Sequence, residues 1–343
     1  MPKVLVVASS RKTRGGITTV IKQHEKGEQW KKFHCLWIQT HRDGPSWRKV
    51  FYFVTAIIEF TFCLPFYDIV HIHHSLQGST HRKYLFFKLA KAFHKKTVVH
   101  IHCGNQLLEV WNDDYQNMYT RCDRGIALSN NIKEIIESHI GKNDKISVVF
   151  NPCPSIVKPV AEAMRKREIL FSGTLYEGKG YRDLIRAFGK IAQNHRDWKI
   201  VFAGNGEVHL GAEIAKECGI SDQCRFLGWV SGDAKDQAYR SASILCLPSY
   251  AEGFPMAVLD AWAYGLPVIT TPVGGIPDIA EDGRNMLLFN PGDIDVLAKQ
   301  LDRMISDSSL RESIAKESVR LANTTFNVEA INRKLGDIYA SLC

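Results

Sequence analysis

Two carboxylates, Glu252 and Asp260, stand eight positions apart in the stretch SYAEGFPMAVLDAWAYG, residues 249–265. Gly253 and Pro255 indicate a turn, and the apolar residues that follow indicate a helix. Eight residues are a little over two helical turns, so both carboxylates can face one side. Such a pair suits sugar hydroxyls, and the first turn of the helix suits an anion such as a diphosphate. The alternative is that Glu252 caps the helix and Asp260 is an unrelated surface residue.

Two glycine-rich turns offer further places for an anion. In RGGITTVI, Gly15 and Gly16 separate an expected strand from an expected helix, so the backbone could approach a phosphate at the helix N-terminus. In FSGTLYEGKG, residues 171–180, Lys179 could neutralise a phosphate. The alternatives are an ordinary Gly-Gly turn and a surface lysine.

Six of the 13 histidines fall in or near two expected strands: His71, His73, His74, His81, His100 and His102. Histidines that alternate along a strand are typical of structural or cleft-lining positions, and a metal site is the alternative. The D-x-D string at Asp293 and Asp295 follows Asn-Pro-Gly. It is expected to cap and begin a helix, so no metal site is predicted there.

Short β-branched runs alternate with longer amphipathic segments, which predicts an α/β protein with parallel sheets and helices on both faces. The expected strands cover residues 3–9, 68–74, 97–103, 124–129, 146–151, 168–175, 198–206, 224–230, 243–249, 267–275 and 286–292. Residues 151–168 contain three prolines and are expected to link two doubly wound domains. Ligands would bind in a cleft at the carboxyl ends of the strands.

Positive charge is concentrated in the first 150 residues, which hold 22 Lys and Arg against 12 Asp and Glu, whereas the remaining residues hold 22 against 24. This balance suits an anionic partner such as a membrane surface, a phosphorylated lipid or a nucleic acid, and the alternative is a solvated basic face. The aromatic and basic interleaving of RNA-binding motifs is missing, so no nucleic acid is expected.

The most hydrophobic stretch, residues 50–66, contains Glu59 and Pro65 and is shorter than the ~20 residues that a bilayer demands. A buried helix is favoured, and a helix lying at a membrane interface is the alternative. The nine cysteines form no C-x-x-C pair, which favours reduced thiols in the cytoplasm. The first residues are typical of a strand and not of a signal peptide.

The stretch 249–275 resembles the E-x7-E region of the retaining family 4 ("group 1") glycosyltransferases, which have the GT-B fold. The family pattern of E-G-F, a second acid, G-x-P-V-I and a G-G pair is met by Glu252, Gly253, Phe254, Asp260, Gly265, Pro267, Val268, Ile269, Gly274 and Gly275. The resemblance is strong from about residue 168 to residue 295 and looser in the N-terminal half.

This resemblance implies a GT-B architecture of two Rossmann-like, doubly wound domains that face a central cleft. Residues 1–155 would bind the acceptor and residues 165–327 the nucleotide sugar. The helix at about 328–343 would pack back on the first domain.

The resemblance also implies roles for single residues. Glu252 and His102 would touch the donor sugar, Lys179 the diphosphate, and Asp260, in place of the usual Glu, the ribose. Thr174 stands where the family usually has an Arg. The remaining implied donor contacts are Gly15, Gly16, Gly173, Gly204, Val230, Gly253, Phe254, Pro255 and Met256. No metal cofactor is implied, because Lys179 and helix N-termini would carry the phosphate charge.

Together these features predict a retaining glycosyltransferase that moves a sugar from a UDP- or GDP-hexose to an acceptor hydroxyl. The acceptor is expected to be a lipid-linked saccharide in cell-surface polysaccharide or O-antigen synthesis. The protein is expected in the cytoplasm, with peripheral contact to the anionic inner membrane face through its basic N-terminal domain. The alternatives are another GT-B enzyme, such as a nucleotide-sugar epimerase, and a non-catalytic nucleotide-sugar-binding scaffold, given Thr174 and Asp260.

Overall fold

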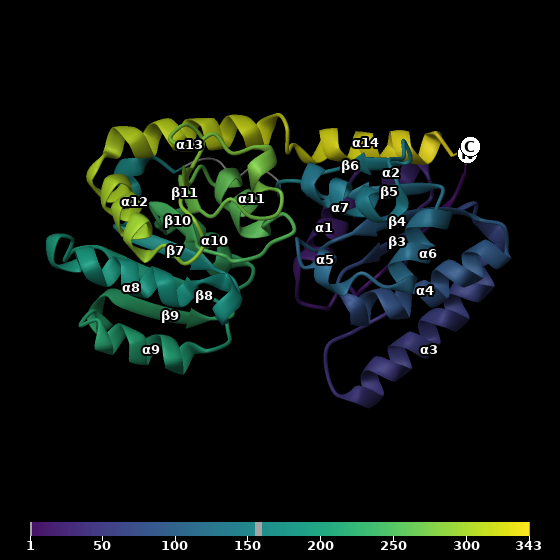
Figure 1. The fold of residues 1–343 in the computed structure, drawn as a ribbon, viewed down its shortest axis with the longest axis horizontal. Helices are drawn as coiled ribbons and strands as arrows, with labels where there is room; N and C mark the ends of the chain where they lie inside the picture. Colours follow the sequence, from purple (N-terminus) through teal and green to yellow (C-terminus); the bar gives the residue numbers. More distant parts are fainter. Residues whose placement is uncertain (1, 155–159, 343) are drawn as a thin grey trace. The chain divides into compact units, whose positions relative to one another are not determined.

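All named strand pairings in the computed structural model, which describes residues 2–154 and 160–342, are parallel, and the strands form two six-stranded sheets (Figure 1). The chain divides into one unit of Met1–Pro152 with Phe326–Cys343 and a second unit of Cys153–Thr325. The sequence places these boundaries at residues 155 and 327. The predicted α/β class, with two doubly wound Rossmann-like domains, is confirmed.

The first sheet has the strand order β2-β1-β3-β4-β5-β6. Its strands are β1 (Val4–Ala8), β2 (Leu36–Gln39), β3 (Ile69–His74), β4 (Lys96–Ile101), β5 (Arg124–Ala127) and β6 (Ile146–Val148). The sequence analysis misses β2, which is four residues long and pairs with β1 alone at the edge of the sheet.

Helices cover both faces of this sheet because side chains alternate between the faces along each strand. The helices are α1 (Gly16–Glu25), α2 (Glu28–Lys32), α3 (Ser46–Cys63), α4 (Gln77–Ala92), α5 (Leu107–Val110), α6 (Asp113–Arg121), α7 (Asn130–Ile140) and α14 (Val328–Ala340). Leu5 and Val7 of β1 pack with α3, α4, α6 and α7, whereas Val4 and Val6 pack with α1 and α14.

Helix α14 therefore completes the core of the first unit from the far end of the chain. Ile331, Leu335 and Tyr339 are buried in it. The Tyr339 hydroxyl and His71 Nδ1 lie 2.7 Å apart, and Asn332 Oδ1 lies 2.7 Å from His24 Nδ1.

The second sheet has the order β12-β11-β10-β7-β8-β9. Its strands are β7 (Glu168–Ser172), β8 (Lys199–Ala203), β9 (Cys224–Gly228), β10 (Ile244–Leu247), β11 (Val268–Thr270) and β12 (Leu287–Leu288). The helices are α8 (Tyr181–Ile191), α9 (Val208–Glu217), α10 (Asp233–Ser241), α11 (Met256–Ala263), α12 (Ile294–Ser306) and α13 (Ser308–Asn323). Asp293 caps α12 by accepting from the Val296 N–H at 3.0 Å, which confirms the prediction for the D-x-D string.

Part of the predicted linker, residues 155–159, lies outside the described residues. The described residues on either side of it belong to the second unit. The Cys153 thiol donates to Leu259 O at 3.4 Å, and the Arg165 guanidinium donates to Ala242 O at 2.8 Å and to Tyr264 O at 2.7 Å.

Helix α3 is not buried, so the favoured prediction for residues 50–66 is wrong. Ala56 and Phe60 are its buried residues, and most of its other apolar side chains are exposed. Ser46–Phe66 is long and apolar enough to cross a membrane by length and composition, and 17% of its most apolar window is buried. The prediction fails because α3 is apolar around most of its circumference, and a single helix offers the sheet only one face.

Candidate active site

The order of strands in the second sheet reverses between β7 and β10. From β7 the chain continues to β8 and β9 on one side, and from β10 it continues to β11 and β12 on the other. In open α/β sheets ligands bind outside the carboxyl ends of the strands at such a switch point. The loops at residues 173–180 and 248–255 follow β7 and β10 and so share this position.

These two loops are fixed to each other by their backbones. Gly180 has φ +65°, and a Cβ there would lie 1.9 Å from Pro248 O, so the position requires glycine. The Tyr250 N–H donates to Gly178 O at 2.9 Å. The side chains of the two loops are thereby brought together from positions about 70 residues apart.

Lys179 and Glu252 form an ion pair at this junction. Lys179 Nζ lies 2.5 Å from Glu252 Oε1, which also accepts from Ser249 Oγ at 2.8 Å. Ser249 is held in turn by Thr271, whose hydroxyl donates to Ser249 O at 2.5 Å. The Lys179 and Glu252 side chains are only 21% and 11% exposed, so their charges are weakly screened. The structure thus brings together the residue predicted to touch the donor sugar, Glu252, and the residue predicted to touch the diphosphate, Lys179.

The turn between β10 and α11 is closed by the glycine pair after β11. A Cβ at Gly274 would lie 2.2 Å from Glu252 O, and the Gly275 N–H donates to Gly253 O at 2.7 Å. Phe254 and Pro255 are buried, and Met256 begins α11. Among the described residues no side chain caps α11, so the start of this helix can offer backbone N–H groups to a ligand.

Asp260 lies on α11 and is paired with a different lysine. Its Oδ2 accepts from Lys235 Nζ of α10 at 2.6 Å, and the aspartate is only 6% exposed. Burial raises the pKa of Asp260 and the Lys235 ammonium opposes that shift. Glu252 and Asp260 therefore do not share a partner: each carboxylate has its own lysine.

The remaining predicted donor residues of this unit all follow the carboxyl ends of its strands. Gly173 follows β7, and a Cβ at Gly204 would lie 1.7 Å from Gly173 O, so the loops after β7 and β8 touch. Thr174 is exposed beside Gly173, and Val230, half-buried, follows β9. They share one edge of the sheet with Glu252.

In the first unit the predicted site residues also follow strand ends. Gly15, with φ +145°, precedes α1, which begins at Gly16 without a side-chain cap. His102 follows β4, and its Nε2 lies 2.9 Å from His73 Nδ1. Burial lowers the pKa of His102 to about 3, so its imidazole is neutral at pH 7.

A cluster of buried histidines lies behind His102. Ring nitrogens of His71, His73 and His100 lie within 4.8 Å of one another, and the three residues are at most 1% exposed. Burial lowers the pKa of all three well below 6.5. Neither ring nitrogen of His100 has a hydrogen-bond partner among the described residues. The prediction of structural or cleft-lining histidines fits this burial, and metal binding remains untested.

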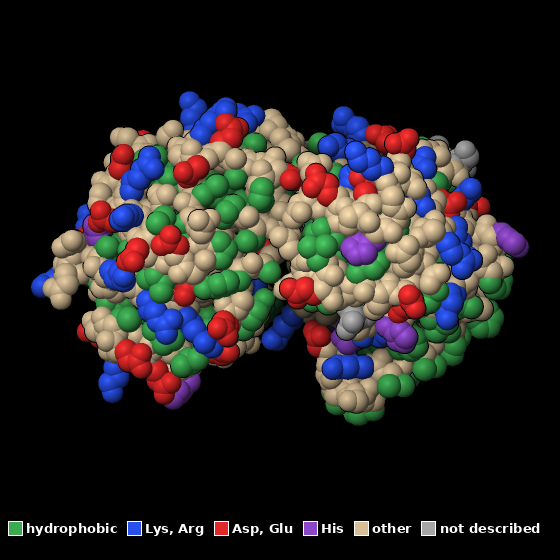
Figure 2. All heavy atoms as spheres, in the orientation of Figure 1, with side chains coloured by type: hydrophobic (Ala, Val, Ile, Leu, Met, Phe, Trp, Pro, Cys, Tyr) green, Lys and Arg blue, Asp and Glu red, His purple; other side chains and the backbone are tan. Residues whose placement is uncertain are grey.

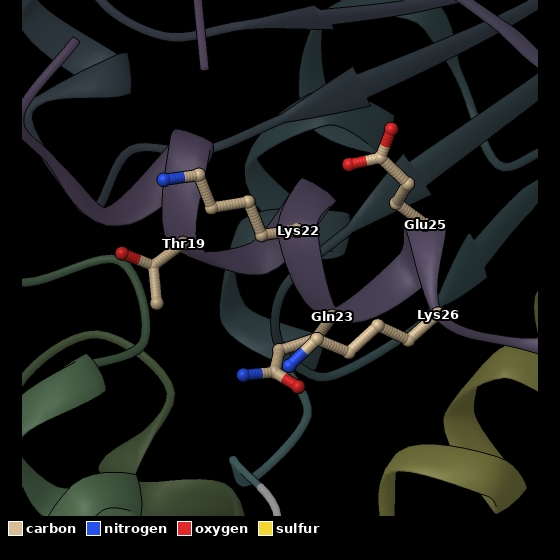
Figure 3. Close-up of a pocket in the computed structure, with 5 residues that line it drawn as sticks. All are labelled: Thr19, Lys22, Gln23, Glu25 and Lys26. Carbon is tan, nitrogen blue, oxygen red and sulfur yellow. The ribbon is translucent and has the colours of Figure 1, made fainter. Parts of the chain in front are cut away.

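A separate hollow of about 370 Å³ lies along α1 (Figure 3). The side chains that line it are Thr19, Lys22, Gln23 and Glu25 of α1 and Lys26 directly after it. Because the lining mixes positive, negative and neutral groups, it selects no particular ligand charge.

The sequence analysis misses two site residues, Ser249 and Lys235. Ser249 stands three positions before Glu252, and this spacing is typical of a local hydroxyl-to-carboxylate contact. Lys235 lies 25 positions before Asp260, and no local pattern connects the two.

A cation, a carboxylate and a helix N-terminus at the switch point of a doubly wound domain define a candidate anion-binding site in a protein of the two-domain Rossmann-like class. Two family models together match most of the chain: Glycosyl transferases group 1 at residues 154–320 and Glycosyltransferase Family 4 at residues 8–154. The chain belongs to this group of glycosyltransferases.

Among curated relatives, the chain is 26% identical over 300 residues to an uncharacterized glycosyltransferase of Methanocaldococcus jannaschii, covering 80% of this chain and 75% of the relative. It is 32% identical over 195 residues to the lipopolysaccharide 1,6-galactosyltransferase of Salmonella typhimurium, covering 54% of each. The match thus spans about half the length of that relative.

Solved structures share the fold along the whole chain. The HepE protein of Anabaena in complex with UDP and glucose superposes with a TM-score of 0.79 at 18% identity, over 99% of this chain and all of the other. The apo lipopolysaccharide outer core galactosyltransferase WaaB gives 0.72 at 23% identity, with the same coverage. These likenesses confirm the GT-B fold.

Proposed function

We propose that the protein is a retaining glycosyltransferase that transfers a hexosyl unit from a UDP- or GDP-hexose to a hydroxyl of a saccharide. The observation that carries the proposal is the Lys179–Glu252 pair, held by Ser249 at the switch point of the second sheet. The UDP and glucose bound to HepE and the galactosyltransferase activity named for the Salmonella relative support it.

The ion pair is proposed to open when the donor binds. The diphosphate, which carries more charge than one carboxylate, would take the Lys179 ammonium, and the first turn of α11 would add N–H donors. Glu252, still oriented by Ser249, would then face the sugar. Positive charge that develops on the sugar ring in the transition state would be stabilised by this carboxylate.

The proposed transfer is a front-face displacement. The acceptor oxygen forms its bond to the anomeric carbon on the side from which the diphosphate departs, and the bond from that carbon to the phosphate oxygen breaks. The acceptor proton passes to the departing phosphate oxygen. The anomeric configuration is thereby retained. Lys179 and the helix N-terminus are proposed to neutralise the leaving group without a divalent metal.

A lipid-linked saccharide is the proposed acceptor, in the synthesis of cell-surface polysaccharide. The basic charge of the first 150 residues and the lipopolysaccharide substrate named for the Salmonella relative favour this choice. The protein would then act in the cytoplasm and at the inner face of the membrane.

Calorimetric titration of UDP, GDP, ADP and CMP in EDTA tests the donor site. One nucleoside diphosphate should bind saturably, and Lys179→Ala should weaken it about tenfold or more, because a charge-assisted hydrogen bond is lost. Lys190→Ala, which removes a half-exposed lysine paired with Asp295, is the matched control and should bind as wild type.

Failure to bind any of the four nucleotides would contradict the proposal and favour a scaffold without a functional donor site. Such a result would indicate that the exposed Thr174 leaves too little positive charge for a diphosphate. Binding that disappears in EDTA and returns with a divalent ion would contradict the metal-free mechanism.

A further inference from the structure

Seven large apolar side chains stand out from α3 and the short 3-10 helix after it (Leu64–Phe66). Each is between 48% and 76% exposed: Trp47, Val50, Phe51, Val54, Ile58, Phe62 and Phe66. The six on α3 recur every three or four residues, so they lie on one side of the helix. Apolar side chains line the lower right edge of the molecule in Figure 2, where Figure 1 places α3. A patch of this length on a monomer marks an interaction surface.

The opposite side of α3 is anchored in the core of its own unit. Ala56, Phe60 and Leu64 are buried there, and the Phe60 and Phe86 rings meet edge to face at 5.1 Å. Helix α3 also connects β2 to β3, and both strands pair in parallel with β1. A helix that crossed a bilayer would place these two strands on opposite sides of the membrane. Helix α3 can therefore lie along a membrane but cannot span it.

The threonine hydroxyls on the apolar side already donate hydrogen bonds to backbone carbonyls of α3. The Thr55 hydroxyl donates to Phe51 O at 2.9 Å, and the Thr61 hydroxyl donates to Ile57 O at 2.8 Å. No hydroxyl donor on this side would be left unpaired in an apolar medium, which is the condition that a lipid environment imposes. Glu59 is the only acid on α3, and burial raises its pKa, which lowers the cost of moving it from water.

Basic side chains lie near both ends of the apolar side. Residues 44–108 contain eight Lys and Arg but only two acids. Arg48 and Lys49 lie at the start of α3, Lys88 lies exposed on the neighbouring α4, and Lys95 Nζ lies 3.4 Å from Pro65 O at the far end of α3. Arg48 lies over the Trp47 ring, 5.5 Å from its centroid, so positive charge borders the apolar side at both ends of α3.

We propose that α3 docks the protein on an anionic lipid bilayer, lying in the plane of the membrane with its exposed apolar side among the upper acyl chains. The basic side chains would contact lipid phosphates, as in other interfacial amphipathic helices. A second copy of the chain is a poorer occupant. A two-fold interface would bring the same basic border of each copy against the other. This inference rests on the first unit alone and does not depend on the proposed donor chemistry.

Sedimentation of the full-length protein with lipid vesicles tests the proposal. The vesicles are phosphatidylcholine alone and phosphatidylcholine mixed with phosphatidylglycerol, each at low and high salt. Wild type should bind the mixed vesicles and bind the neutral ones more weakly. Phe51→Gln with Phe62→Gln should lower the binding constant about tenfold or more, because both rings leave the acyl region. Arg48→Gln with Lys95→Gln should lower it about tenfold on the mixed vesicles only.

Met164→Gln provides the matched control for the apolar substitutions. Met164 is 78% exposed, close to the 76% of Phe62, but lies in the second unit. The control should bind vesicles as wild type does. Circular dichroism checks that every variant folds, and titration with the nucleoside diphosphate that wild type binds reports separately on the donor site.

Three results would overturn the proposal. In the first, the Phe51/Phe62 variant binds mixed vesicles as wild type does, so only surface charge attracts the protein. In the second, wild type binds neither kind of vesicle. In the third, light scattering shows a dimer that this variant dissociates, so a second copy covers α3. Loss of nucleotide binding with vesicle binding intact would count against the donor site and leave this inference standing.

Discussion

At the scale of the single residue, Glu252 commits only one of its two carboxylate oxygens to the protein. Oε1 accepts from Lys179 and Ser249, whereas none of the described residues donates a hydrogen bond to Oε2. A carboxylate that is fixed through one oxygen keeps its direction and still has the other oxygen for a ligand. An anion with more charge than a carboxylate can therefore replace Glu252 as the partner of Lys179.

Glu252→Gln should lower kcat of sugar transfer by about 10²–10³-fold, because a neutral amide does not stabilise positive charge in the transition state. Binding of the nucleoside diphosphate should be unchanged or tighter, since Lys179 loses its competing carboxylate. Steady-state kinetics and calorimetry on one preparation measure both. Glu177→Gln, an exposed acid in the same loop as Lys179, is the control. Equal loss of kcat in both variants would contradict the role given to Glu252.

Lys235 and Asp260 form the second carboxylate pair, and the sequence alone does not reveal it. Lys235→Met should destabilise the protein by about 1–3 kcal/mol, because it leaves a buried carboxylate without its partner. The double variant Lys235→Met with Asp260→Asn should recover part of this loss, because no charge is left buried. Denaturant titrations of these two variants and of the single variant Asp260→Asn form a double-mutant cycle. Additive losses would show that the contact contributes no stability.

At the scale of the element, the sequence predicts strands that extend beyond their carboxyl ends. The expected strands 168–175, 198–206 and 267–275 end at Ser172, Ala203 and Thr270 in the structure. The residues between the observed and the expected strand ends include further apolar and β-branched side chains. They lie outside the strands and form the loops at the carboxyl edge of the sheet. The composition of these residues does not predict where the strands end, although Gly173 and Gly204 come directly after two of them.

The contacts between elements are less predictable. The family resemblance selects Lys179 and Glu252, but only the packing of Gly180 against Pro248 shows why they meet. The apolar segment 50–66 fails as a predicted core helix because its exposed and buried sides have similar composition. Which side the sheet covers depends on the crossover from β2 to β3, and β2 is the described strand that the sequence analysis misses.

The start of α12 provides a test at this scale. Asp293→Ala should lower the free energy of unfolding by about 1 kcal/mol, because the Val296 N–H loses its capping acceptor. Asp295→Ala should cost less, since that exposed carboxylate acts only through the helix dipole and a surface pair with Lys190. Thermal unfolding in EDTA measures both. A loss of transfer activity that Mn²⁺ restores would indicate that the string binds metal.

At the scale of the whole molecule, the first unit combines a basic surface with an unusually histidine-rich core. Burial lowers the pKa of seven of its described histidines: His24, His41, His71, His73, His74, His100 and His102. The same β-strands that support the predicted site therefore carry groups that are neutral when folded and basic when unfolded. The stability of this unit is linked to pH through these strands.

The free energy of unfolding of the first unit should consequently fall already at mildly acidic pH. The unfolded histidines take up protons below about pH 6.5, whereas His24 in the folded unit does so only near pH 4 and His102 near pH 3. The unfolded state then binds more protons, so the folded state is at full stability above pH 6.5 and loses it as pH falls. Each histidine that stays neutral in the folded unit costs on the order of 1 kcal/mol between pH 7.5 and 5.5, so together they can cost several kcal/mol.

His100→Leu isolates one of these contributions, because neither ring nitrogen of His100 has a partner to lose among the described residues. Urea titrations from pH 8 to pH 5 should show equal or greater stability at pH 8 and a pH dependence smaller by about one proton. His209→Leu, which removes a 91% exposed histidine of the second unit, should leave the pH dependence unchanged. A large loss of stability at pH 8 with an unaltered pH dependence would show that His100 binds a group such as a metal ion, and that its burial is not merely structural.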